Sequence, residues 1–167
     1  MILTQHSELT QVRKQFQDKT IVFCSGAFDL PHPAHVIFFE DCKKFGDILV
    51  VTVGDDISIR SYKGHGRPIF NHAMRTKMID AMKPVDYCFM SIVPDLKNLF
   101  SDIEIIFAAL KPNVYVIKDD AFDIPSRQKM CQQFDVNLII LKREESHEFS
   151  NISTTNIIET IIRTHKI

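Results

Sequence analysis

Short apolar runs alternate with amphipathic segments along most of the chain, and this alternation limits the fold more than any other feature. The runs Thr20–Cys24 and Asp47–Val53 are rich in β-branched residues, and the second is apolar almost throughout. Strands of this kind are buried on both faces of a sheet. The segment between them, Ala34–Phe45, carries apolar residues near helical spacing. The alternation therefore predicts a parallel sheet with helices on both faces.

The same pattern predicts the remaining elements. Strands are expected at 85–90, 114–117 and 137–141, and helices at 7–16, 71–82, 96–110, 126–134 and 154–163. Gly46 is expected to end one helix and Asn71 to cap another. We expect one domain over residues 1–167, with a core at about 20–162 and an N-terminal helix at about 7–16. The expected fold class is α/β: a Rossmann-like, doubly wound parallel sheet in three α/β/α layers.

Length and charge exclude several classes of protein. A chain of 167 residues with net charge −1 and mixed signs shows no basic stripe for nucleic acid. No apolar run approaches the roughly 20 residues of a membrane helix, and the first residues lack the layout of a signal peptide. We therefore expect a cytoplasmic protein without nucleic-acid or membrane partners. The four cysteines lie far apart and are expected to be buried free thiols.

In a parallel sheet, ligands bind beyond the carboxyl ends of the strands. The loops at 25–35, 54–70, 91–95, 118–125 and 142–153 occupy that edge in the expected fold. The first of them holds Gly26 and two histidines, His32 and His35, where a helix begins. Backbone N–H groups at a helix start attract anions. From position alone, two interpretations of the histidines stay open: contact with phosphate, or a capping or core role. A metal site lacks an obvious third ligand nearby.

The string GAFDLPHPAH at 26–35 resembles the GxFDxxHxGH signature of cytidylyltransferase-like nucleotidyltransferases, with Ala34 at the second glycine. Four further segments agree in order. Residues 45–51 and 84–87 resemble the entries to the family's second and third strands. Residues 60–69 resemble the Lys-Gly then Arg-Pro segment of heptose-1-phosphate adenylyltransferases, and 152–158 their Ser-Thr-Thr-x-Ile-Ile motif. Arg75 falls at that group's following arginine, or is simply an exposed helix residue. The resemblance runs from about residue 20 to about 162.

This resemblance implies the site. The implied catalytic residues are His32, His35, Lys63 and Arg67, with the last two in a flexible loop after the second strand. The implied nucleotide-binding residues are Gly26, Ala27, Phe28, Asp29, Lys118, Ser153, Thr154 and Thr155. Ser153–Thr155 also suit the start of a helix, where serine and threonine are favoured caps. Mg²⁺ is expected to arrive with the nucleoside triphosphate, and no protein residue is assigned as a metal ligand.

The resemblance implies a nucleotidyltransferase that transfers a nucleoside monophosphate to a sugar phosphate such as heptose 1-phosphate, with release of pyrophosphate. ATP is the favoured donor. One alternative is CTP-dependent transfer to glycerol 3-phosphate or another alcohol phosphate. Another is a nucleotide-binding protein without activity, motivated by Ala34 and by Asp119-Asp120, where the heptose enzymes have two glycines. The family also implies a homodimer.

Overall fold

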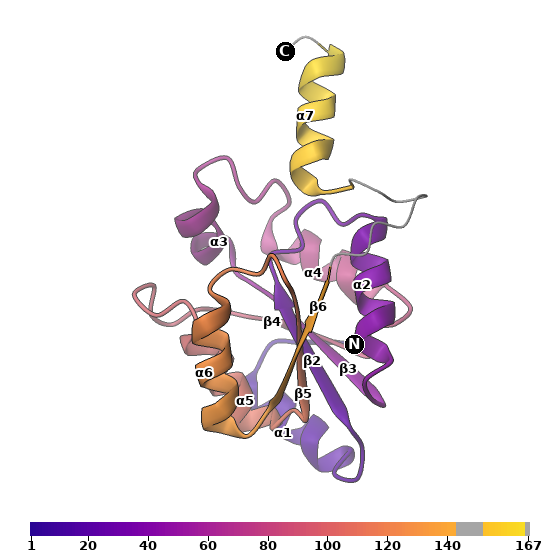
Figure 1. The fold of residues 1–167 in the computed structure, drawn as a ribbon, viewed down its shortest axis with the longest axis vertical. Helices are drawn as coiled ribbons and strands as arrows, with labels where there is room; N and C mark the ends of the chain where they lie inside the picture. The colour runs from indigo at the N-terminus through magenta and orange to yellow at the C-terminus, as the bar shows by residue number, and fades with distance from the viewer. Residues whose placement is uncertain (143–151, 166–167) are drawn as a thin grey trace.

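The computed structural model describes residues 1–142 and 152–165. Over these residues the chain forms one parallel sheet of six strands in the order β1-β4-β3-β2-β5-β6 (Figure 1). The strands are β1 (Ile2–Leu3), β2 (Ile21–Gly26), β3 (Ile48–Val53), β4 (Tyr87–Met90), β5 (Val114–Lys118) and β6 (Asn137–Leu141). The helices are α1 (His6–Gln15), α2 (Pro33–Lys43), α3 (Asp56–Lys63), α4 (His72–Asp80), α5 (Ser101–Leu110), α6 (Ile124–Phe134) and α7 (Thr154–His165).

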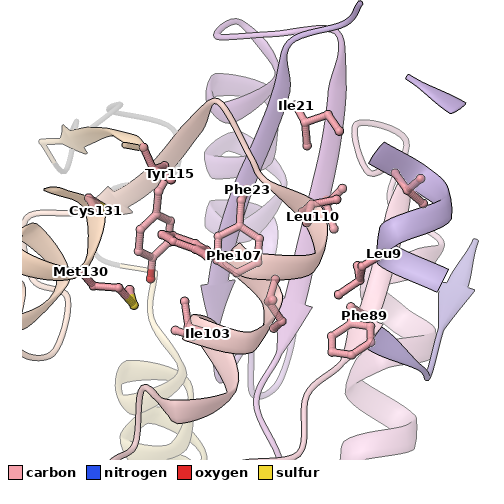
Figure 2. Packing of buried hydrophobic residues seen from close by; sticks show 14 of the residues in the cluster. Leu9, Ile21, Phe23, Phe89, Ile103, Phe107, Leu110, Tyr115, Met130 and Cys131 are labelled. Carbon is pink, nitrogen blue, oxygen red and sulfur yellow. The ribbon is translucent and has the colours of Figure 1, made fainter. Parts of the chain in front are cut away.

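Helices cover both faces of the sheet, which confirms the α/β, doubly wound class in three layers. Helices α1, α5 and α6 pack on one face, and α2 and α4 on the other. Figure 2 shows the first of these cores, where the ring of Phe107 meets those of Phe23 and Tyr115 edge-on at 5.4 and 5.5 Å between centroids. Leu9 and Val12 of α1 are buried in the same cluster, so the N-terminal helix is part of this core.

Strand order reverses between β2 and β5, and this reversal locates the crevice where ligands of such folds bind. From β2 the chain continues on one side through β3 and β4, and then crosses to β5 and β6. The β2–β5 ladder pairs only Val22 with Val114 and Phe23 with Tyr115. The loops that leave the carboxyl ends of β2 and β5 therefore run over opposite faces and leave a crevice between them.

Two predicted boundaries were wrong. Residues 54–70 were expected to form a loop, but they contain α3, which Asp55 caps by accepting hydrogen bonds from the backbone of Ile57 and Ser58. Lys63 therefore ends a helix. The helix expected at 96–110 begins only at Ser101. Asp95 and Asn98 accept hydrogen bonds from backbone N–H groups two residues ahead, and such side-chain turns compete with helix formation.

The two expected caps had different outcomes. Asn71 caps α4 by accepting a hydrogen bond from the backbone of Met74 at 3.0 Å. The cap of α2 is Lys44, so the prediction for Gly46 was wrong. A Cβ at Gly46 would lie 2.7 Å from the carbonyl oxygen of Thr20, and glycine is needed there for close backbone approach.

All four cysteines are buried free thiols, as expected. In the described parts of the chain, no helix combines the length and the apolar character needed to cross a bilayer.

Candidate active site

A cavity of about 610 Å³ lies at the carboxyl ends of β2 and β5. All twelve residues singled out from the sequence line it, although they come from four separate segments of the chain. These residues are Gly26, Ala27, Phe28, Asp29, His32, His35, Lys63, Arg67, Lys118, Ser153, Thr154 and Thr155. The fold therefore brings the predicted set together, and the individual roles stay predictions.

His32 and His35 form the start of α2. His32 is the residue that caps the helix, and its backbone N–H donates to Nδ1 of His35 at 3.2 Å. The two rings stack with centroids 3.8 Å apart. Because Nδ1 of His35 accepts this bond, the ring proton of neutral His35 resides on Nε2. His32 therefore has a capping role at α2. Its hydrogen bond to Nδ1 of His35 leaves Nε2 of His35 as the ring nitrogen that can donate.

His35 is held in its neutral form. Burial, with smaller contributions from the charges of His32, Lys118 and Lys63, lowers the pKa of His35 to about 3. An edge-on contact with the ring of Phe28, at 5.5 Å between centroids, helps to bury it. Near neutral pH the imidazole is therefore an uncharged donor whose orientation is set before any ligand arrives.

Asp29 organises the loop between β2 and α2. Its carboxylate accepts hydrogen bonds from Nε of Arg67 at 2.8 Å and from the backbone of Ile69 and Phe70 at 2.8 and 3.0 Å. The Asp29 side chain is fully buried. Its neighbours Phe28 and Leu30 both have φ of 45°, in the left-handed region that costs a non-glycine residue about 1 kcal/mol or more. The buried carboxylate holds this loop and positions Arg67 at the cavity wall.

Arg75 joins the loops behind the cavity. It is 0% exposed, so its interpretation as an exposed helix residue was wrong. Its guanidinium donates to the carbonyl oxygens of Ala27, Gly54 and Phe70 at 2.5–2.9 Å, and it forms an ion pair with Asp56 at 2.6 Å. One buried cation thereby connects the ends of β2 and β3 with the starts of α3 and α4.

In the described part of the chain, four cationic side chains line the cavity: Lys63, Arg67, Lys118 and Arg127. Burial and the nearby charge of Arg67 lower the pKa of Lys63. The ammonium of Lys118 lies 5.2 Å from the centroid of the Phe38 ring. Concentrated positive charge at a partly buried wall favours a polyanionic ligand such as a triphosphate.

Arg127 also lines the cavity but was not predicted from the sequence. Its guanidinium donates to the carbonyl oxygen of Phe122 at 2.8 Å and to the hydroxyl of Tyr115, and it lies 4.9 Å from the ring centroid of Phe100. Arg127 lies on a helix outside the resemblance motifs, so nothing local distinguished it from a surface arginine. Only the packing of α6 beside β5 brings it to the cavity.

The start of α7 forms another wall of the cavity. Ser153 accepts a hydrogen bond from the backbone of Asn156 at 3.1 Å, which is the expected cap. The hydroxyl of Thr154 donates to the carbonyl oxygen of Asp29 at 2.6 Å. Helix α7 stands above the sheet layers in Figure 1, and none of its residues is buried.

The family model described as "Cytidylyltransferase-like" matches residues 23–160, which cover every segment of the cavity. The chain belongs to the cytidylyltransferase-like family. "Bifunctional protein HldE" of Helicobacter hepaticus is 33% identical over 162 residues, which are 97% of this chain and 30% of that protein. "FAD synthase" of Archaeoglobus profundus is 30% identical over 142 residues, 84% of this chain and 85% of that protein.

Solved structures agree with the cytidylyltransferase-like fold. The crystal structure of the lipopolysaccharide core biosynthesis protein from Thermoplasma volcanium has a TM-score of 0.60 and 26% identity, over 74% of this chain and 95% of that one. The chain spans only 20–33% of the length of its HldE relatives. Most of each HldE relative therefore lies outside the part that aligns with this chain.

Two departures from the cytidylyltransferase-like pattern lie at this site. Ala34, at the position of the signature's second glycine, lines the cavity in the first turn of α2. Asp119 and Asp120 follow β5; Asp120 lines the cavity, while the backbone of Asp119 bonds to Leu141 at 3.0 Å. Among the described residues, no group of three or more His, Cys, Asp and Glu side chains is placed to hold a metal ion.

Proposed function

We propose that this member of the cytidylyltransferase-like family transfers a nucleoside monophosphate from a nucleoside triphosphate to the phosphate of a small acceptor. ATP is the favoured donor. The observation that carries the proposal is the single cavity that combines the His32–His35 pair with four cationic side chains. Its volume of about 610 Å³ suits a nucleotide, since small-molecule sites are typically about 300–1,000 Å³.

In the proposed reaction, an oxygen of the acceptor phosphate attacks the α-phosphorus while the bond to the departing pyrophosphate breaks. A phosphate acceptor is already ionised near neutral pH, so the protein needs no strong base. Nε2 of His35 donates to an α-phosphate oxygen, with His32 beside it. Lys63 and Arg67 stabilise the charge on the reacting phosphates, and residues 153–155 hold the leaving pyrophosphate. Groups oriented before the reaction in this way account for large rate effects.

Mg²⁺ suits this donor set as a partner of the triphosphate. Magnesium commonly binds through substrate phosphates and one or two carboxylates. Asp29 is fully engaged by Arg67 and backbone groups. Among the described residues, this leaves Asp120 as the cavity carboxylate available for such a contact. The ion would neutralise negative charge on the triphosphate.

The first acceptor class to test is a sugar phosphate such as heptose 1-phosphate, because residues 60–69 and 152–158 match that group and HldE relatives align over nearly the whole chain. The chain covers 85–89% of the length of the FAD synthase relatives. Because FAD without its adenylyl group is flavin mononucleotide, their name motivates flavin mononucleotide as a further acceptor to test. Cytidylyl transfer to glycerol 3-phosphate remains the alternative on the nucleotide side. Ala34 and Asp119-Asp120 motivate the third hypothesis, a nucleotide-binding protein without turnover.

The experiment incubates the protein with Mg²⁺, inorganic pyrophosphatase and each of ATP, CTP, GTP and UTP. The acceptors are sugar 1-phosphates, glycerol 3-phosphate, nicotinate mononucleotide and flavin mononucleotide, and the readout is phosphate release. Release with one nucleotide and one acceptor supports the proposal and identifies both substrates. Nucleotide binding without release across the panel contradicts it, and Ala34→Gly then tests whether the added methyl group blocks turnover.

We also propose that the protein is a cytoplasmic homodimer. Four buried free thiols suit a reducing compartment. Helix α7 leaves Ile161 and Ile162 47% and 50% exposed, and an apolar helix face of this kind suits contact with a second copy. Light scattering coupled to gel filtration measures the mass directly. A monomer at micromolar concentration would contradict the dimer and leave the reaction untouched.

A further inference from the structure

A second, smaller cavity of about 80 Å³ adjoins the first. It lies among the ends of β3 and β4 and the helices α3 and α5. Five residues line both cavities: Ser25, Gly26, Tyr62, Phe122 and Arg127. A group bound in the small cavity would therefore be continuous with whatever occupies the large one.

Thr52 points to a ligand in this small cavity. The residue is 2% exposed, yet within the described parts of the chain its hydroxyl has no hydrogen-bond partner. Buried hydroxyls nearly always have a partner, and an exception calls for a ligand or a water molecule. The cavity that Thr52 lines is the space from which such a partner would come.

Ser91 lies beside Thr52 and faces the same way. Thr52 pairs with Phe89 across the β3–β4 ladder, and Ser91 follows two residues later, on the same face of the sheet. The Ser91 hydroxyl donates to the buried carboxylate of Asp102, whose other oxygen bonds to His6 at 2.9 Å. Because its proton is committed to Asp102, Ser91 offers only an accepting oxygen to a ligand.

The size and walls of the cavity limit what enters it. A water molecule needs about 10–15 Å³ of such space, so the cavity holds roughly six non-hydrogen atoms, the size of one ring. Its walls away from Thr52 and Ser91 are mostly aliphatic or aromatic, with Ile59, Val93 and Ile103 among them. The other serines that line it are engaged: Ser25 with Tyr115 and Ser58 with Asp55. A ring that carries hydroxyls on all sides would leave most of them without partners.

We propose that the small cavity binds one planar heterocyclic ring of the acceptor, with an N–H and a carbonyl oxygen side by side on its inner edge. The N–H donates to Ser91, and the carbonyl accepts from Thr52. The acceptor's phosphate extends into the large cavity, where it meets the nucleotide. The inference rests on the proposed function for the identity of the substrate, and it favours ring-bearing phosphomonoesters over sugar phosphates.

A binding test that requires no catalytic turnover uses 2-pyridone, a single ring with an N–H next to a carbonyl oxygen. Ligand-observed NMR is expected to show millimolar binding to the wild-type protein. The 1-methyl derivative, which lacks the N–H, is expected to bind roughly 3–10-fold more weakly. Xylose, a ring bearing hydroxyls, is expected not to bind. Equal binding of 2-pyridone and its methyl derivative would overturn the inference, as would its displacement by ATP, which would make the cavity a base site.

Thr52→Val and its control separate a ligand contact from a structural role. Valine keeps the shape and removes the hydroxyl, so 2-pyridone affinity is expected to fall roughly 3–10-fold while the melting temperature stays equal or rises. Ser101→Ala removes another buried hydroxyl that has no partner in the described structure and lies outside both cavity linings. The control is expected to leave 2-pyridone affinity unchanged. Equal losses of 2-pyridone affinity in both variants would contradict a contact between the Thr52 hydroxyl and the bound ring.

The acceptor panel distinguishes failure of this inference from failure of the proposed function. Transfer to sugar phosphates with the same kcat/KM in wild type and Thr52→Val would overturn the ring site and support the transferase. Ring binding that Thr52→Val weakens, without transfer to any acceptor, would support the ring site and contradict the transferase. The supporting result for both is a ring-bearing acceptor whose KM rises in Thr52→Val while the KM for ATP does not change.

Discussion

The two walls of the large cavity are built in opposite ways. The wall formed by the β2–α2 loop and residues 67–70 is held from behind by buried charged groups, Asp29 and Arg75. The wall formed by the start of α7 contributes no buried helix residue, and Thr154 bonds it to Asp29. Both walls present the start of a helix to the cavity. The first is part of the fold, whereas the second rests against it.

Because of this difference, substitutions in the two walls are expected to affect protein stability and ligand binding to different extents. A change in the first wall is expected to alter the folded protein as well as the site, because buried charges without partners are costly. A change in the second wall is expected to alter phosphate binding and leave the melting temperature almost unchanged. A lightly held wall also suits a site that must admit and release a large anion.

The largest expected effect follows from His35→Ala in the first wall. Loss of the Nε2 donor to the α-phosphate is expected to lower kcat by about 10²–10³-fold. Steady-state kinetics with the best substrates measures it. His165→Ala changes an exposed histidine at the end of α7 and is expected to have full activity. Turnover like that of the wild type in His35→Ala would remove His35 from the mechanism.

Asp29→Asn tests whether the first wall is part of the fold. It removes the charge that faces Arg67 and puts an amide donor near two backbone N–H groups. Unfolding free energy is expected to fall by about 3 kcal/mol, which lowers the melting temperature by about 6–12 °C. The matched change Asp120→Asn, at an exposed cavity carboxylate, is expected to cost less than about 0.5 kcal/mol. Equal melting temperatures for both variants would contradict the interpretation that the buried Asp29 makes the first wall part of the fold.

The neutral state of His35 predicts acid sensitivity of the first wall. The pKa of His35 is about 3 in the folded protein against 6.5 for an exposed histidine. The unfolded chain therefore binds a proton below pH 6.5 that the folded protein does not, so stability falls as the pH falls toward 3. From pH 7 to pH 5 this amounts to about 2 kcal/mol. Denaturant unfolding at both values measures it, and His35→Gln is expected to lose about 2 kcal/mol less than the wild type.

Thr154→Val in the second wall gives the smallest expected effect. It removes the hydrogen bond to Asp29 and a hydroxyl from the proposed pyrophosphate site. Affinity for the nucleotide is expected to fall roughly 3–10-fold, with a change of at most about 2 °C in melting temperature. Calorimetry and thermal melts measure the two quantities. Thr164→Val, on the far end of α7, serves as control. A large loss of stability in Thr154→Val would make the second wall part of the fold as well.

Much of the site was predictable because it lies in local sequence patterns. The Gly26–His35 string, the Lys63 to Arg67 segment and Ser153–Thr155 each follow or approach an expected element, and parallel topology brings such loops to one edge. Other cavity residues lie in the expected loops but at no motif position. Tyr62 and Phe122 stack at 5.5 Å between centroids and line both cavities, although they come from α3 and the loop after β5.

Hydrophobic periodicity and short motifs are local properties, so the sequence was enough to predict the class of the fold, the sheet edge where the large cavity lies and twelve of the residues that line it. Which polar groups are buried, and what they bond to, became known only from the packed structure. Asp29 and Arg75 fall at positions of the resemblance motifs, but nothing in the sequence indicates that they are buried, and Thr52 looks like an ordinary strand residue. The roles of Asp29 and Arg75 depend on partners up to 48 positions away, and that of Thr52 on the absence of a partner in the described chain. Burial is a property of the packed fold, which short sequence motifs do not contain.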